Sequence, residues 1–355
     1  MSETEFFNQI DLLIKEESPF VFYRKPKEKE VVSVIQKDDA LHPDPDLTEK
    51  GFVFFPFDLK DKKIVFPYDQ CKIKVFSLDT EDVFINSLDL PEKRNNSAKE
   101  KFISLIERGL EVINSGKISK VVLSRAEEVL FPEKKIGEMY KNLLNRYPGA
   151  FVYVWFHPGI GLWMGATPET LLTIKKGKFT TMALAGTRPF KGRKDIVWGK
   201  KEKQEQQFVT DYILSELDRE KLEVGRPYTL RAGSLQHICT DIKGEISKKN
   251  NLRNLVGSLH PTPAVCGLPG RESFEFILNN EDYKRSYYTG FLGEINNGPD
   301  NDTDLFVNLR CMKIDINMRN RATLYVGGGI TSGSVPLKEW EETVEKSMIM
   351  KSVLF

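Results

Sequence analysis

Two glutamates and a lysine near the C-terminus have the spacing needed to share one face of a helix. Glu339, Glu342 and Lys346 occupy positions i, i+3 and i+7 of a segment that Pro336 opens, and proline suits a first helical turn. An apolar run over 324–330 precedes them and contains three glycines, which is typical of a buried strand with an approachable backbone. Together these groups could bind an anion and a metal ion. The alternative is a solvated i,i+4 pair, worth roughly 0.2–0.5 kcal/mol.

A second pair of glutamates repeats this spacing. Glu202 and Glu205 lie on one face of a helix that the apolar periodicity predicts over about 199–219. Mg²⁺ is usually held by one or two carboxylates together with substrate oxygens and water. Two helices that each carry a Glu-x-x-Glu pair could therefore converge on one magnesium ion.

A lysine and a glutamate stand in apolar segments where charge is unusual. Lys120 lies within a strand predicted over 118–125, and Glu169 is the only charged residue between 161 and 172. If they are buried, the lysine has a lowered pKa and can act as a base, and the glutamate has a raised pKa and can act as an acid. The ordinary alternative for each is a side chain that reaches water from the face or end of a strand.

An arginine and a histidine also interrupt predicted strands. Arg310 lies in an apolar strand expected over 306–312, where it would be a natural partner for a carboxylate. His237 is the lone histidine of a strand-like stretch over 234–240, and such a histidine is more often structural than catalytic.

Length and composition favour a globular protein without nucleic-acid or membrane partners. The chain has 355 residues, of which 40% are hydrophobic and 29% charged, and its net charge is +1, so no basic excess indicates nucleic acid. Its first residues are acidic, and no apolar run approaches the roughly 18 residues of a membrane span. The few cysteines are far apart, which suits a reducing compartment: Cys71, Cys239, Cys266 and Cys311. We therefore expect a cytoplasmic protein.

The order of the predicted elements places most of the chemistry after residue 98. Residues 6–16 have a helical period, and short strands separated by Pro, Asp and Gly then form a meander through the first ninety residues. A polar segment over 91–97 is the best candidate for a linker. We expect a single domain over 1–355, with a variable strand-rich part over 1–95 and a catalytic core over 98–355.

Taken in order, the motifs of that core resemble those of the chorismate-utilising enzymes, which include the isochorismate, salicylate, anthranilate and aminodeoxychorismate synthases. The matching stretches are Lys120–Arg125 (KVVLSR), Gly165–Glu169 (GATPE), Ala185–Pro189 (AGTRP), Leu259–Ala264 (LHPTPA), Tyr288-x-Gly290-x-x-Gly293, Leu309–Cys311 (LRC), Gly327–Ile330 (GGGI) and Glu339-Trp340-x-Glu342-Thr343. The resemblance implies an α+β fold in which two large, mainly antiparallel sheets pack as a sandwich with helices outside.

The resemblance also assigns roles within a Mg²⁺-dependent site for chorismate. It implies that Glu205 and Glu342 bind the metal directly and that Glu202 and Glu339 support them. It implies that Lys120 is the base that activates water and that Glu169 is the acid, with His237 orienting the ring. The positions expected to bind substrate are Arg310, Tyr288, Gly327, Gly329, Lys346, Ala264, Gly186 and Thr187.

Three positions indicate which member of the family this chain resembles. Lys120 is typical of the members that add water, Ala185 replaces the nucleophilic lysine of many aminodeoxychorismate synthases, and Ala264 is similar to isochorismate synthases. We therefore expect an isochorismate synthase that supplies menaquinone or siderophore synthesis and acts as a monomer. Two alternatives remain open, a salicylate synthase that also releases pyruvate and a chorismate-binding subunit that needs a partner. Gln206 and Phe190 depart from the residues that many relatives carry.

Overall fold

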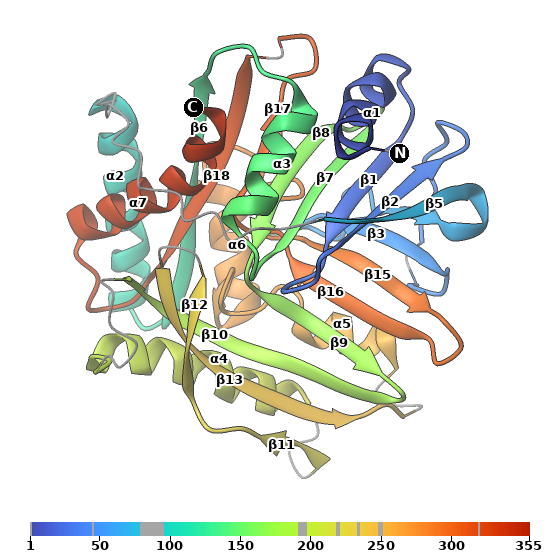
Figure 1. Cartoon of the computed structure of the whole chain (residues 1–355). Coiled ribbons are helices and arrows are strands. Elements are labelled where there is room, and N and C mark those ends of the chain that lie inside the picture. The colour runs from blue at the N-terminus through green and yellow to red at the C-terminus, as the bar shows by residue number, and fades with distance from the viewer. Residues whose placement is uncertain are drawn as a thin grey trace.

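Two large antiparallel sheets form the body of the protein. The computed structural model describes residues 2–44, 46–78, 96–190, 197–217, 221–232, 235–247, 251–318 and 320–355. Each sheet has nine strands, and the helices lie on the outside of the two sheets (Figure 1). The predicted α+β sandwich is therefore confirmed.

The first sheet runs from the strand of Lys120 to the N-terminal strands. Its spatial order is β14 (Gly267–Leu268), β6 (Lys120–Leu130), β18 (Arg321–Ile330), β17 (Cys311–Ile314), β8 (Gly161–Thr167), β7 (Phe151–His157), β1 (Phe20–Arg24), β2 (Glu30–Gln36) and β5 (Cys71–Ser77). All neighbouring strands are antiparallel. Strands β6 and β18, which carry Lys120 and the three glycines, lie side by side along ten residue pairs.

The second sheet contains β9, the strand that directly follows Glu169. Its spatial order is β11 (Glu223–Val224), β13 (Leu235–Glu245), β10 (Lys178–Pro189), β9 (Thr170–Lys175), β16 (Asp302–Val307), β15 (Phe291–Asn297), β3 (Gly51–Phe55) and β4 (Ile64–Pro67), and β12 (Tyr228–Ala232) also pairs with β13. The short turn between β8 and β9 therefore crosses from one sheet to the other. Glu169 lies in that crossover.

Aromatic side chains join the two sheets across the sandwich. The rings of Phe151 and Phe306 stack with centroids 4.2 Å apart, and those of Phe54 and Trp155 lie 4.6 Å apart. All four residues are buried. Burying such a side chain stabilises the fold by about 1.5–3 kcal/mol, and a well-placed pair adds about 0.5–1.5 kcal/mol. Phe151 pairs with Thr167 and Phe306 with Thr170, so the first of these contacts lies beside the crossover that carries Glu169.

Helices cover the outer faces of the sandwich. The described helices are α1 (Glu3–Lys15), α2 (Asn96–Asn114), α3 (Ile136–Arg146), α4 (Lys200–Glu216), α5 (Leu252–Leu259), α6 (Gly270–Asn280) and α7 (Pro336–Leu354), with a 3-10 turn at Tyr68–Gln70. In Figure 1, α1 and α3 cover the first sheet, whereas α4 lies beneath β10 and β13 of the second. No described helix is long and apolar enough to cross a membrane.

The N-terminal strands differ from the single meander that the sequence predicts. Strands β1, β2 and β5 belong to the first sheet, where β1 pairs with β7, whereas β3 and β4 belong to the second, where β3 pairs with β15. Strands β1, β3 and β4 are buried along their whole length, because each lies within the sandwich beside strands from later in the chain or from the same sheet, whereas β5 is a largely exposed edge strand. Within the expected linker, residues 91–95 lie outside the described residues, and α2 begins at Asn96.

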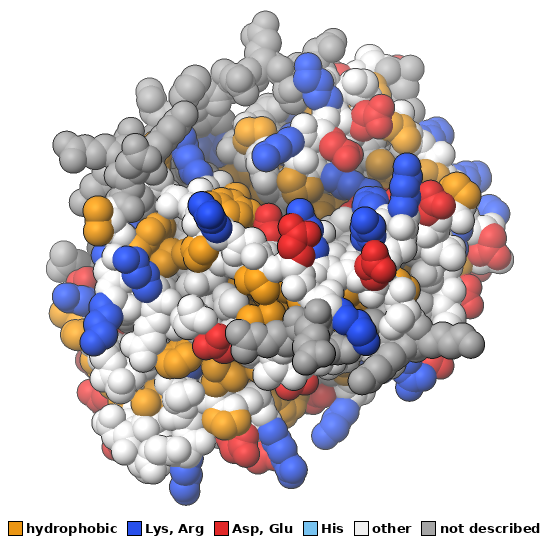
Figure 2. All heavy atoms as spheres, turned by 90° about the horizontal axis from the view of Figure 1, so that it is seen from below, with side chains coloured by type: hydrophobic (Ala, Val, Ile, Leu, Met, Phe, Trp, Pro, Cys, Tyr) orange, Lys and Arg blue, Asp and Glu red, His pale blue; other side chains and the backbone are white. Residues whose placement is uncertain are grey.

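One face of the molecule carries charges of both signs. Figure 2 shows it with basic and acidic side chains interspersed, together with scattered apolar side chains. This mixture differs from the continuous basic stripe that is typical of nucleic-acid binding.

Candidate active site

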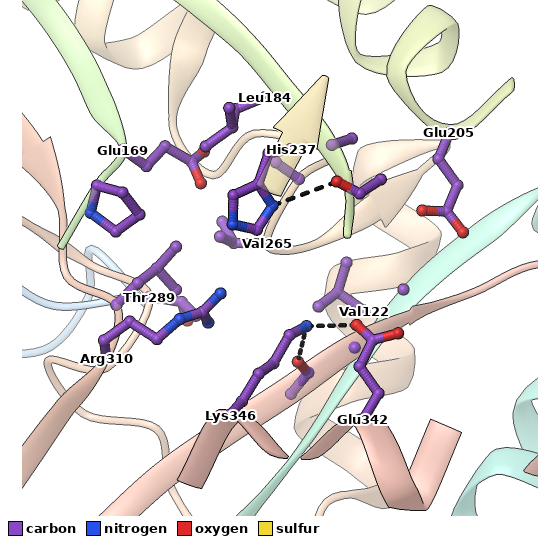
Figure 3. A pocket seen from close by; sticks show the side chains of 18 of the residues that line it. Val122, Glu169, Leu184, Glu205, His237, Val265, Thr289, Arg310, Glu342 and Lys346 are labelled. Carbon is purple, nitrogen blue, oxygen red and sulfur yellow. Dashed lines mark hydrogen bonds and ion pairs between the residues drawn. The ribbon is translucent and has the colours of Figure 1, made fainter. Parts of the chain in front are cut away.

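One pocket between the two sheets collects most of the residues that the sequence predicts to be functional. Its walls come from both sheets, from helices α4 and α7, and from the loops that follow α5 and α6. The predicted site residues that line it are Lys120, Glu169, Gly186, Glu205, His237, Ala264, Tyr288, Arg310, Gly327, Gly329, Glu342 and Lys346. Figure 3 shows the charged side chains among them converging on one space.

The two carboxylates expected to bind a metal come from different helices. Glu205 lies on α4 and Glu342 on α7, and both line the pocket. In Figure 3 their carboxylates point toward one another across it. Oxygen donors of this kind suit Mg²⁺, which needs only one or two protein carboxylates when substrate and water supply the remaining ligands. The donor set therefore fits the ion, although no three His, Cys, Asp or Glu side chains form a metal-binding group among the described residues.

The two supporting glutamates lie behind the pocket wall. The Glu202 carboxylate accepts a hydrogen bond from Arg188 Nε at 2.7 Å and does not line the pocket. Glu339 is buried, and a Cβ atom added to Gly328 would lie 3.7 Å from Glu339 Oε2 and 3.8 Å from Glu342 Oε1. Both carboxylates of α7 therefore lie close to strand β18 at Gly328.

Lys346 makes the i,i+4 pair that its spacing predicts, but inside the pocket. Its Nζ atom lies 2.6 Å from Glu342 Oε1 and donates a hydrogen bond to Gly327 O at 2.9 Å. The Lys346 side chain is 8% exposed. The interpretation of this pair as a solvated helix face is therefore wrong, because α7 packs this face against β18.

Glu169 has the electrostatic environment of an acid that retains its proton near neutral pH. The residue is 5% exposed in the crossover between β8 and β9. Burial raises its pKa to about 7, against the opposing effects of the positive charges on Arg310, Lys120 and Lys346. The carboxyl group therefore combines a raised pKa with three cationic neighbours in one pocket.

Lys120 lies on β6 and reaches the pocket past a glycine. The residue is only 2% exposed. A Cβ atom added to Gly329 would lie 3.1 Å from Lys120 Cε and 3.7 Å from Lys120 Nζ, so the missing side chain on β18 makes room for the amine. The ordinary alternative, a lysine that extends into solvent, is therefore wrong for this position.

His237 is held as a neutral imidazole by its surroundings. Burial lowers its pKa to about 3, and the positive charges of Arg310 and Lys346 act in the same direction. Its Nδ1 atom lies 3.2 Å from Gly186 O, a carbonyl that can only accept, so Nδ1 carries the proton. In this tautomer Nε2 is an acceptor.

Arg310 reaches the pocket from a position that the sequence misassigns. The expected strand over 306–312 is two strands, β16 in one sheet and β17 in the other, and Arg310 lies in the crossover between them with φ of 48°. The apolar residues on both sides concealed the break, because each belongs to a different buried strand. The crossover places the guanidinium beside Glu169 and His237.

The three glycines lie within a strand and not at its end. Gly327, Gly328 and Gly329 belong to β18, and none has positive φ. Their role is close approach: a Cβ atom at Gly327 would lie 2.7 Å from Leu123 O and 3.1 Å from the Tyr288 hydroxyl. Pairing between β17 and β18 stops at Tyr325. Beyond Tyr325, the edge of β18 that β17 would cover is not paired with β17.

Sequence reasoning missed several apolar parts of the pocket. Val122, Leu184, Val265 and Leu309 line it, and of these only Val122 follows from the sequence, since alternation along β6 places it on the same face as Lys120. The others come from loops and from a second sheet, whose pairing the sequence does not specify. Thr187 lies opposite His237 in the β10–β13 register, and its side chain is outside the described part of the structure.

Comparisons with known proteins identify relatives of this chain. The isochorismate synthase DhbC of Bacillus subtilis is 29% identical over 271 residues, which cover 71% of this chain and 67% of that protein. The isochorismate synthase MenF of Escherichia coli is 30% identical over 268 residues, which cover 72% of this chain and 60% of that protein. The anthranilate synthase component 1 of Aquifex aeolicus is 25% identical over 284 residues, which cover 75% of this chain and 55% of that protein.

Solved structures share the fold. A crystal structure described as a putative 2,3-dihydroxybenzoate-specific isochorismate synthase, DhbC, from Bacillus anthracis superposes with a TM-score of 0.79, at 23% identity, over 97% of this chain and 98% of that one. The sequence profile described as chorismate binding enzyme matches residues 70–355. The chain therefore belongs to the chorismate-binding enzyme family.

Proposed function

We propose that the protein is an isochorismate synthase, which converts chorismate to isochorismate by adding water at C2 and removing the C4 hydroxyl. The observation that carries this proposal is the joint burial of Lys120 and Glu169 in one pocket. Lys120 on β6 and Glu169 in the crossover between β8 and β9 supply the base and the acid that the exchange of two hydroxyl groups requires. The product would supply menaquinone or siderophore synthesis.

The proton transfers follow from the two buried groups. Lys120, in its uncharged form, takes a proton from the water that attacks C2, and burial favours the uncharged form of an amine. The ring double bond shifts, and the C4 hydroxyl leaves as water after it receives the Glu169 proton. One water enters and one leaves, and transfer of the proton from Lys120 to Glu169 through solvent returns both groups to their starting forms. The two isomers are similar in energy, so the reaction is readily reversible. The pKa of about 7 at Glu169 suits an acid that works near neutral pH.

Cationic and neutral groups of the pocket hold and orient the substrate. Arg310 and Lys346 would bind the enolpyruvyl carboxylate, with the Tyr288 hydroxyl and the amides near Gly327 as further donors. The acceptor Nε2 of His237 would receive a hydrogen bond from a ring hydroxyl. Because its pKa is lowered to about 3, this histidine is a weak base and can orient the hydroxyl without competing with Lys120.

Glu205 and Glu342 would hold a Mg²⁺ ion beside the ring carboxylate. When bound, the ion supplies positive charge that neutralises this carboxylate and fixes the ring. The pairing of Lys346 with Glu342 adds a cation at the same side of the pocket. An anionic substrate would therefore be held between the metal site at Glu205 and Glu342 and the guanidinium of Arg310.

A salicylate synthase is the nearest second candidate, since it would carry out the same first step and then release pyruvate. Ala264 supports the proposed function over this alternative, because it gives the pocket wall a small apolar side chain where salicylate synthases tend to carry a larger polar one. A chorismate-binding subunit without catalysis is disfavoured by the presence of both Lys120 and Glu169 in the pocket.

Product analysis tests the proposal. The purified chain is incubated with chorismate and Mg²⁺, without ammonia, and the products are separated and identified by mass. We expect isochorismate in equilibrium with chorismate and no pyruvate. Salicylate with pyruvate would favour the second candidate, and an absence of any product would contradict the proposed catalysis by the chain alone.

A further inference from the structure

Three residues of the family motifs have no place in the pocket. Arg125 ends the KVVLSR stretch, and Trp340 and Thr343 belong to the Glu-Trp-x-Glu-Thr stretch, yet none of them lines the pocket. Arg125 follows Lys120 by five residues on β6, so the two side chains lie on opposite faces of the strand. The structure brings these three residues together on the outer face, against α7.

The contacts among them are specific and mostly buried. The Arg125 guanidinium lies 4.4 Å from the centroid of the Trp340 ring, and its Nε atom donates to Thr343 Oγ1 at 2.9 Å. Thr343 has 0% exposure, and its own hydroxyl proton goes to Trp340 O at 2.8 Å. The hydroxyl is therefore fully used as both donor and acceptor between strand and helix.

A second ionic contact anchors the far end of the same helix. Glu127 accepts from Arg125 Nη1 at 2.9 Å and lies 2.6 Å from Lys351 Nζ, near the end of α7. Strand β6 thus holds α7 at three places along its length, at Trp340, Thr343 and Lys351. This attachment fixes both the translation and the rotation of the helix.

Rotation of α7 decides where its pocket side chains point. Glu342 directly precedes Thr343, and Lys346 lies one turn further, so both turn with the Thr343 contact. With a helix radius of about 5–6 Å including side chains, a rotation of about 20° displaces their ends by about 2 Å. Mg²⁺ demands near-ideal octahedral geometry at about 2.0–2.1 Å, so it tolerates little of this displacement.

We propose that Arg125 is a positioning residue that sets the rotation of α7 through Thr343 and Trp340, and so aims Glu342 and Lys346 into the pocket. The inference rests on the proposed function, because it assigns a purpose to the metal-binding carboxylate. Arg125 touches neither substrate nor metal in this account. Its effect passes entirely through the helix.

The test removes the Thr343 hydroxyl without changing the shape of the side chain. Thr343→Val is isosteric and loses the acceptor of Arg125 Nε, whereas Thr343→Ser retains it. Binding of Mn²⁺ is measured by the EPR signal of the free ion, with chorismate present at equilibrium with its product. We expect the Mn²⁺ dissociation constant of Thr343→Val to rise about tenfold or more, as for the loss of one hydrogen bond to a charged group, and that of Thr343→Ser to stay near the wild-type value.

A matched control lies one turn along the same helix. Ser347 is also fully buried, but its hydroxyl donates to Val344 O within α7. Ser347→Ala should leave Mn²⁺ binding unchanged, because this hydrogen bond does not join the helix to β6. A role limited to stability would lower the melting temperature of Thr343→Val but leave the dissociation constant of the folded protein unchanged, and that result would overturn the proposal.

Arg125→Lys provides a second route if Thr343→Val does not fold. The lysine keeps the positive charge but loses the planar group that both stacks on Trp340 and donates from Nε. We expect weaker Mn²⁺ binding and a lower kcat with a nearly normal melting temperature. Wild-type Mn²⁺ affinity in this variant would overturn the positioning role alone, whereas an absence of Mn²⁺ binding in the wild-type protein would overturn the proposed metal site as well.

Discussion

Lys120 Cε would lie 3.1 Å from a Cβ atom placed on Gly329, closer than an ordinary van der Waals contact, so any side chain at this position would push the buried lysine aside. The two residues lie on the neighbouring strands β6 and β18. The absence of a side chain at Gly329 on β18 thus leaves room for Lys120, the proposed base on β6. This relationship can be tested by adding a single methyl group.

We expect Gly329→Ala to lower kcat by less than the roughly 100-fold that a displacement of a catalytic group by about 1 Å can cause, because the added Cβ moves Lys120 Cε by only a few tenths of an ångström. The backbone of Gly329 does not have positive φ, so alanine should fold without backbone strain. The control is Gly333→Ala, where an added Cβ meets nothing within 4 Å. Steady-state kinetics and thermal melts check both variants, and equal kcat in the two would contradict the crowding argument.

Removing the Lys120 amine should abolish turnover without unfolding the chain. General-base catalysis contributes roughly 10²–10⁴-fold, so we expect at least that loss in Lys120→Ala. Lys117→Ala, at an exposed position three residues earlier, should keep wild-type rates. Rates are measured with chorismate and Mg²⁺, and circular dichroism confirms folding. Wild-type turnover in Lys120→Ala would show that another group activates water.

Glu169→Gln should inactivate the protein and yet stabilise it at alkaline pH. Because burial raises the pKa of Glu169 from 4.5 to about 7, the folded state binds more protons than the unfolded state between these values. Stability is therefore lost as pH rises through this window, by about 3 kcal/mol in full. Glutamine avoids that loss, so urea denaturation should show a gain over wild type at pH 8 that is absent at pH 4. A constant difference between the two pH values would contradict the raised pKa.

The same ionisation should appear in the kinetics. If protonated Glu169 is the acid, kcat/KM of the wild-type protein falls as pH rises above about 7, where the carboxyl group loses its proton. The pH profile of kcat/KM measured from pH 5 to pH 9 checks this expectation. An alkaline limb that lies well above pH 8 would assign the proton to another group.

Glu342→Gln should weaken metal binding far more than a neighbouring change. The amide retains the shape of the side chain but removes the negative charge that faces Glu205 across the pocket. We expect the Mg²⁺ concentration for half-maximal activity to rise at least about tenfold, as for the loss of one charged interaction. Glu341→Gln, at an exposed position, serves as the control. Equal Mg²⁺ dependence of these two variants would remove Glu342 from the proposed metal site.

The local chemistry of the site could be predicted from the sequence, whereas its assembly could not. Lys120 and Glu169 were identifiable because a lone charge in an apolar strand is unusual, and both are buried in the pocket. Periodicity also identified α4 and α7 with the faces that carry Glu205 and Glu342. The burial of Lys346 was not predictable, because the same i,i+4 spacing fits a solvated helix equally well.

The misassigned parts are those where tertiary pairing determines the structure. The run through Arg310 is apolar on both sides, and only the choice of different sheets by β16 and β17 reveals the crossover between them. The N-terminal strands read as one meander for the same reason, since β1 and β3 pair with strands more than a hundred residues away. Strand propensity identifies such segments but not their partners.

The most direct test of the account is the origin of the oxygen in the product. The protein is incubated with chorismate and Mg²⁺ in water enriched in ¹⁸O, and the isochorismate formed in the first turnover is analysed by mass spectrometry. Attack of solvent water at C2 predicts that this isochorismate carries one ¹⁸O atom at C2, and that Lys120→Ala forms none. An unlabelled isochorismate would contradict water addition, because the hydroxyl would then have moved within the substrate.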